Sequence, residues 1–109
     1  MSARPHVTPR QSAVDEVVTS WPGVHARPVF GQRAYVRGRK MFAFLADAGV
    51  SVKAGSPQEA EELCERDGVA PFVYGEGMEM KGWPVLPLRS DEELDEALSV
   101  IRRAYEAAE

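Results

Sequence analysis

Three segments of the chain carry apolar residues every three or four positions, the spacing that places side chains on one face of an α-helix. Each segment is preceded by a capping residue, at Thr8, Ser56 or Ser90, with a Gln or Glu three positions later. Pro22-Gly23 and Gly68 end the first two segments. The predicted buried stripes are Val14, Val17, Val18 and Trp21; Ala60, Leu63 and Cys64; and Leu94, Ala97, Leu98, Ile101, Tyr105 and Ala108.

Between the helices the apolar residues fall in short runs bounded by turn residues, which is typical of β-strands. Arg37-Gly38-Arg39-Lys40 and Ala48-Gly49 are the expected turns of two hairpins. Pro28 favours an edge position for the first strand, because proline cannot donate a ladder hydrogen bond. A glycine-rich loop is predicted from Gly75 to Gly82. The predicted strands span residues 24–30, 34–36, 41–46, 50–53, 71–74 and 83–88.

The predicted order is helix, three or four strands, helix, two strands, helix. Tight turns imply antiparallel neighbours, and the simplest packing places the helices over one face of a single twisted sheet. We therefore expect a single two-layer α+β domain over residues 1–109, with residues 1–8 as a flexible tail. Strands and helices do not alternate along the chain, which argues against a doubly wound nucleotide-binding fold.

Composition places the chain among ordinary globular proteins. Its 109 residues suit one domain, and no apolar run approaches the roughly 20 residues that cross a bilayer. The first ten residues lack the apolar core of a signal peptide. A single cysteine, Cys64, excludes an intramolecular disulfide. We expect a cytoplasmic protein that does not associate with membranes.

Charge is divided unevenly along the sequence. Residues 1–56 carry eight basic and three acidic side chains, whereas residues 57–109 carry five basic and fourteen acidic ones. Such a chain can present one basic and one acidic region. The alternative is that the helix surfaces are acidic and the strands basic with no functional meaning. The acidic runs themselves are interpreted as solvated helix faces.

A basic hairpin is the best functional candidate. Its cations could neutralise phosphates, and an aromatic ring among them could stack on a base. Strand alternation places Arg33, Tyr35 and Arg37 on one face. The opposing interpretation is that hairpin tips are charged because they are solvated, and that Tyr35 and Phe42 belong to the core. The candidate nucleic-acid-binding residues are Arg33, Tyr35, Arg37, Arg39, Lys40 and Lys53.

Catalytic and metal-binding chemistry finds little support. Cys64 lies on the inward stripe of a short helix and is expected to be inert packing. One ordered histidine, His25, and one cysteine cannot close a tetrahedral zinc site, and a Cys64–His25 dyad is disfavoured. We expect no enzyme activity, no metal and no cofactor. Trp83 and Tyr105 are expected in the core, and either of them exposed in a groove would indicate a ligand or peptide site.

Several short motifs, spread from about residue 12 to the C-terminus, resemble one family. They are Trp21-Pro22-Gly23-Val24, Phe30-Gly31, the block from Gly38 to Leu45, Val52-Lys53-Ala54, Trp83 with Val85 and Leu88, and Ala104-Tyr105-Glu106. With them the sequence resembles the MmcQ/YjbR family of small bacterial proteins. Val29-Phe30-Gly31, the run from Lys40 to Ala43 and the run from Pro71 to Tyr74 also resemble the N-terminal domain of TfoX.

The resemblance implies a fold more firmly than a function. Both families have a two-layer fold of the secretion-chaperone type, and their names imply DNA binding or competence regulation. Neither supplies a family-wide catalytic residue. The first family usually has Ser-Tyr-Glu where this chain has Ala104-Tyr105-Glu106, so a role of that serine would not transfer.

Two functions remain open at this point. The first is a small non-enzymatic regulatory protein that binds DNA through the basic hairpin. Because the chain is acidic overall, such binding would be modest and salt-sensitive. The second is a protein-interaction module, monomeric or homodimeric, that uses the sheet face or an edge strand without binding nucleic acid.

Overall fold

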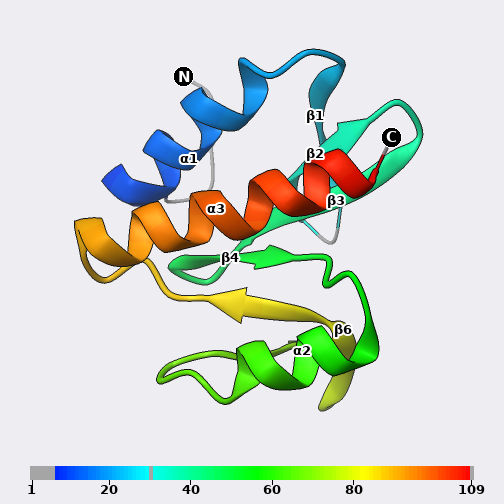
Figure 1. Cartoon of the computed structure of the whole chain (residues 1–109), viewed down its shortest axis with the longest axis vertical. Coiled ribbons are helices and arrows are strands. Elements are labelled where there is room, and N and C mark those ends of the chain that lie inside the picture. The colour runs from blue at the N-terminus through cyan, green and yellow to red at the C-terminus, as the bar shows by residue number, and fades with distance from the viewer. Residues whose placement is uncertain (1–6, 30, 109) are drawn as a thin grey trace.

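The computed structural model describes residues 7–29 and 31–108, which form three helices and a six-stranded sheet (Figure 1). This order confirms the predicted α+β arrangement, with four strands between the first two helices. The elements are α1 (Pro9–Thr19), β1 (Val24–Val29), β2 (Gln32–Arg37), β3 (Lys40–Ala46), β4 (Gly49–Val52), α2 (Pro57–Cys64), β5 (Ala70–Tyr74), β6 (Met78–Leu86) and α3 (Asp91–Ala107).

All three predicted helix caps are confirmed. The side-chain oxygens of Thr8, Ser56 and Ser90 each accept a hydrogen bond from the backbone N–H three residues later, at 3.1, 3.1 and 3.2 Å. Each bond satisfies a donor that the first helical turn leaves unpaired. Thr8 therefore belongs to the folded domain rather than to the predicted tail, and Val7 packs against the core. The remainder of that tail, residues 1–6, lies outside the described residues.

Gln11 joins the start of α1 to the turn between β3 and β4. Its Oε1 accepts from the backbone N–H of Thr8 at 3.0 Å, completing the capping box. Its Nε2 donates to the carbonyl oxygens of Asp47 and Gly49, each at 2.9 Å. Gln11 is almost fully buried, so one side chain both caps the helix and holds it on the sheet.

The sheet is antiparallel throughout, in the order β1-β2-β3-β4-β6-β5. Strand β1 lies at one edge, where Pro28 predicted it. Strand β6 begins at Met78, so the predicted loop from Gly75 to Gly82 is wrong. The turn is confined to residues 75–77, where Gly75 and Gly77 have φ of 58° and 83°, and the methionine run that follows pairs with β5.

A bulge interrupts β6 next to the edge strand β5. Pro71 pairs with Pro84, but the next residue of β5, Phe72, pairs with Met80. The β6 residues between those pairs are Lys81, Gly82 and Trp83. Bulges redirect side chains and often border functional sites, and Trp83 in this one borders a cavity that the first residues of α2 also line.

The main core lies between the helices and one face of the sheet, as predicted. In Figure 1, α1 and α3 run side by side in front of the sheet, and α2 lies over β6. Buried side chains from all three helices meet Tyr35, Phe42 and other strand residues in one cluster. Val17 is the exception to the predicted stripe, since it is 38% exposed.

A second apolar cluster lies on the opposite face of the sheet and was not expected. Phe44 is fully buried there. Its ring lies 4.8 Å from that of Phe72 and 5.4 Å from that of Trp83. Ser51, which lies between Phe44 and Val85 in register, is small enough to let the rings meet across β4. Its hydroxyl donates to the Trp83 carbonyl oxygen at 3.0 Å.

None of the helices in the described residues has the length and apolar character needed to span a bilayer.

Candidate functional site

Two of the candidate residues on β2 contact the first helix: Tyr35 is buried against it, while Arg33 reaches it from an exposed position. The hydroxyl of Tyr35 donates to Oδ1 of Asp15 at 2.8 Å, and Nε of Arg33 forms an ion pair with the same oxygen. Burial, followed by the neighbouring carboxylate, raises the pKa of Tyr35. Because Tyr35 is fully buried, it cannot stack on a base, and this member of the candidate site is corrected to a core residue.

Arg37 is likewise engaged with a helix. Its Nη1 donates to the carbonyl oxygen of Tyr105 at 2.9 Å, and its guanidinium carbon lies 4.2 Å from the centre of the Tyr105 ring. The Tyr105 hydroxyl donates to the Pro22 carbonyl oxygen at 2.7 Å. Arg37 thus fastens the last turns of α3 to β2. Alternation placed Arg33, Tyr35 and Arg37 on one face correctly, but that face is the one covered by helices.

The remaining candidates lie at the surface near one end of the sheet. Lys40 begins β3 and Lys53 follows β4, and both line a cavity of about 520 Å³. Arg103 reaches the same cavity from α3. We call the set of Lys40, Lys53 and Arg103 around this cavity the basic cleft. Arg39 occupies the exposed β2–β3 turn beside Lys40.

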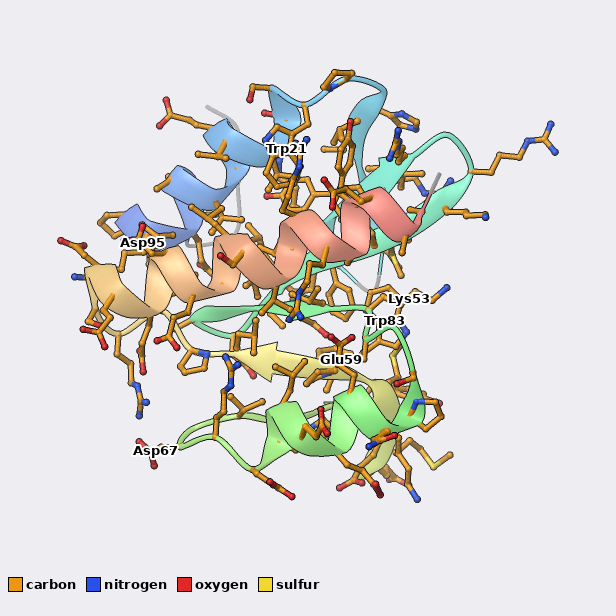
Figure 2. All side chains as sticks on the ribbon, viewed as in Figure 1. Trp21, Lys53, Glu59, Asp67, Trp83 and Asp95 are labelled. Atoms are coloured by element: carbon orange, nitrogen blue, oxygen red, sulfur yellow. The ribbon has the colours of Figure 1, made fainter. Side chains whose placement is uncertain are left out.

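Glu59 organises the basic cleft. Its Oε2 pairs with Nη1 of Arg103 at 3.4 Å, while its Oε1 accepts from the Gly55 N–H at 2.5 Å. Figure 2 shows Glu59 on α2, between α2 and α3. It is the single carboxylate among the described lining residues, against three cations. The cleft is therefore suited to an anion, and Ala104 in its wall offers no hydroxyl for chemistry.

A second cavity, of about 530 Å³, lies next to the basic cleft and shares the segment Lys53-Ala54-Gly55 with it. We call it the Trp83 pocket. Trp83, Cys64 and Ala60 contribute apolar wall, and Trp83 is partly exposed. Exposure of Trp83 in a groove was the expected sign of a ligand or peptide site, and Trp83 is partly exposed in this pocket. Figure 2 places Trp83 and Lys53 at the same end of the molecule.

Cys64 in this pocket is a poor nucleophile. Burial raises the pKa of its thiol, and the nearby Glu79 carboxylate raises it further. His25 lies on β1, at the edge of the sheet opposite β5, and Cys64 lies on α2 over β6, so the topology keeps the two residues apart. Over residues 7–29 and 31–108, no group of three or more potential ligands could hold a metal.

A third cavity, of about 880 Å³, opens between the starts of α1 and α3. Its cations are already engaged in ion pairs. Nε of Arg10 lies 3.2 Å from Oδ1 of Asp91, and Nη2 of Arg89 lies 2.6 Å from Glu93 and 3.2 Å from Asp67. These bonds join the helix starts to the loop after α2, which is a structural task.

Arg103 and Glu59 were not anticipated as site residues. Each lies on an acidic or mixed helix face whose sequence suggests a solvated surface. Only the packing of α2 on β6 and of α3 on β3 and β4 brings them to Lys53. A basic residue near the C-terminal end of an apolar helix stripe, such as Arg103 after Val100, is too common a pattern to indicate a binding site.

Comparison with known families agrees with this fold. The YjbR family profile matches residues 19–107, a span that includes all of α3, the Trp83 pocket and, except for Ala108, the lining of the basic cleft. No curated protein and no solved structure gives a significant match. The matched region covers most of the sequence, and the chain belongs to the YjbR family.

Proposed function

We propose that this YjbR-family protein is a small, non-enzymatic nucleic-acid-binding protein that holds a phosphate backbone at the basic cleft. One observation carries the proposal. Lys40 of β3, Lys53 of the loop after β4 and Arg103 of α3 gather around one cavity, in a chain whose formal net charge is −4. Concentrating cations on an acidic protein is favourable where an anion binds.

The cleft differs from the original hairpin candidate in its membership. Arg33 and Arg37 contact Asp15 and Tyr105 and do not line this cavity, so they lie outside the cleft. Arg39, on the adjacent turn, can extend the positive track along a second phosphate. A site of three or four cations binds weakly. Its affinity falls steeply as the salt concentration rises, because counterion release then contributes less to binding.

The chemistry of the cleft favours binding over catalysis. Its lysines and arginine act as fixed positive charges, and its one carboxylate is bonded to Arg103 and Gly55. The wall residue at position 104 is alanine, and burial raises the pKa of the nearby Cys64 thiol. A reaction would need an activated acid, base or nucleophile in contact with the ligand.

Fluorescence anisotropy with a labelled oligonucleotide over a salt series tests this proposal. Lys53→Ala should weaken binding at low salt and reduce the slope of log K against log salt by about 0.7 to 0.9, the contribution of one phosphate contact. Arg27→Ala is the matched control, because Arg27 is an exposed cation on the edge strand β1, away from the cleft. The proposal fails if no binding occurs at low salt, or if both variants weaken it equally.

A second candidate function rests on the edge strand β5. Val73, Tyr74 and Met78 are 52%, 39% and 57% exposed at the tip of the β5–β6 hairpin. An edge strand with exposed apolar side chains can pair with the same strand of a second copy. Light scattering tests it: a dimer in the wild type that becomes a monomer in Val73→Lys supports a homodimer through β5. A strictly monomeric wild type at high protein concentration argues against it.

A further inference from the structure

The Trp83 pocket and the basic cleft share one wall, the segment Lys53-Ala54-Gly55. From this adjacency we propose that the Trp83 pocket receives an unstacked nucleobase, so that the protein prefers single-stranded to double-stranded nucleic acid. The proposal rests on the proposed function, because the phosphate of the same nucleotide would lie in the basic cleft.

The lining of the Trp83 pocket suits an uncharged planar ring. Trp83, Pro57, Pro71, Ala60 and Cys64 supply apolar surface, and the volume of about 530 Å³ is typical of small-molecule sites. Four charged side chains also line the pocket, and their formal charges cancel. They are Lys53, Lys81, Glu61 and Glu79. A charged group gains no net attraction there, whereas a base gains stacking and apolar contact.

The Trp83 ring is held in place before any ligand arrives. Its backbone lies in the β6 bulge, where the Gly82 carbonyl accepts from the Ala54 N–H at 2.9 Å and the Trp83 carbonyl accepts from the Ser51 hydroxyl at 3.0 Å. The Phe44 ring supports it at 5.4 Å between centres. A preorganised ring loses little conformational entropy on stacking, which favours binding.

Lys53 contributes to both cavities and so links the two parts of a nucleotide. A phosphate near its ammonium would place the attached base on the side of the Trp83 pocket. In a duplex the bases are paired and stacked, and one would have to leave the helix to enter the pocket. In a single strand that cost is largely absent. Strand preference is therefore the property that separates this site from a basic surface alone.

The test uses the full chain with an oligothymidine of about 15 nucleotides and a duplex of the same length. In a Trp21→Phe background, Trp83 is the remaining tryptophan of the sequence, and single strand should quench its fluorescence. Trp83→Ala should weaken single-strand binding about tenfold and leave duplex binding unchanged. Trp83→Phe keeps an aromatic ring and should restore most of the affinity, provided circular dichroism confirms that both variants are folded.

Tyr74→Ala provides the matched control, because it removes an exposed aromatic ring from the neighbouring strand β5, and single-strand binding should not change. If single strand and duplex bind equally, with no change in Trp83 fluorescence and a clear loss on Lys53→Ala, the base-binding proposal is wrong while the proposed function stands. If neither oligonucleotide binds at low salt, both proposals are wrong.

Discussion

The pairing of Asp15 with Tyr35 allows a stability prediction that can be worked from the structure. Asp15→Ala removes the acceptor of the Tyr35 hydroxyl, which lies 2.8 Å away in a fully buried residue. An unsatisfied buried donor costs about 1–3 kcal/mol. The ion pair with Arg33 adds less than about 1 kcal/mol, because the Arg33 side chain is 42% exposed.

Asp15→Ala should therefore lower the free energy of unfolding by about 2–3 kcal/mol, which corresponds to a decrease in Tm of about 10 °C in a domain of this size. Urea titration followed by circular dichroism measures the change. Asp95→Ala is the control, because Asp95 is an exposed carboxylate on α3. It should alter stability by less than about 0.5 kcal/mol.

A double-mutant cycle sharpens the test. Tyr35→Phe removes the donor together with its need for a partner, so Asp15→Ala should cost much less in that background. The expected coupling energy is about 1–2 kcal/mol. The reasoning is refuted if Asp15→Ala costs no more than Asp95→Ala, or if its cost is the same with and without the Tyr35 hydroxyl.

Further predictions concern titration and packing. The pKa of Tyr35 in the folded protein is raised. Its contribution to stability is therefore complete below about pH 10 and is lost as pH rises through that raised pKa. The free energy of unfolding in urea, measured between about pH 8 and 11, should depend less on pH in Tyr35→Phe than in the wild type. Native Cys64, whose thiol pKa is also raised, should react slowly with a thiol probe at about pH 8 and much faster in urea. Gly49→Ala should destabilise the protein by about 1–3 kcal/mol, because the new Cβ would collide with the Leu86 carbonyl oxygen. A Cβ at Gly82 meets no neighbouring atom within 4 Å, so Gly82→Ala should change stability much less.

Much of the fold followed from local signals in the sequence. The caps at Thr8, Ser56 and Ser90 act within four residues, so they could be recognised without knowing the tertiary structure. Pro28 marked the edge strand for a similar reason, since its missing N–H excludes a central position. The β6 bulge had no such signal. It depends on how two strands align across a turn, and Gly82 suggested a loop instead.

The candidate site was predicted only in part, because its members depend on which face of the sheet the helices cover. Arg33, Tyr35 and Arg37 share a face, as the alternation of side chains along a strand requires. The alternation does not show whether that face is buried or exposed to solvent. Asp15 lies off the apolar stripe of α1, and its carboxylate accepts a hydrogen bond from the Tyr35 hydroxyl, which places that face against the helix. Lys53 meets Arg103 of α3 in the cleft, and that residue lies far from it in sequence.

The Gln11 side chain has a consequence for the order in which the molecule assembles. Its two carbonyl acceptors lie 36 and 38 residues further along the chain, and their positions are set only when the β3–β4 hairpin has closed. The first helix can thus form early by its own cap, but its final anchoring must wait for that hairpin. We expect the amide protons of α1 and of the hairpin to exchange with solvent at similar rates, as one cooperative unit.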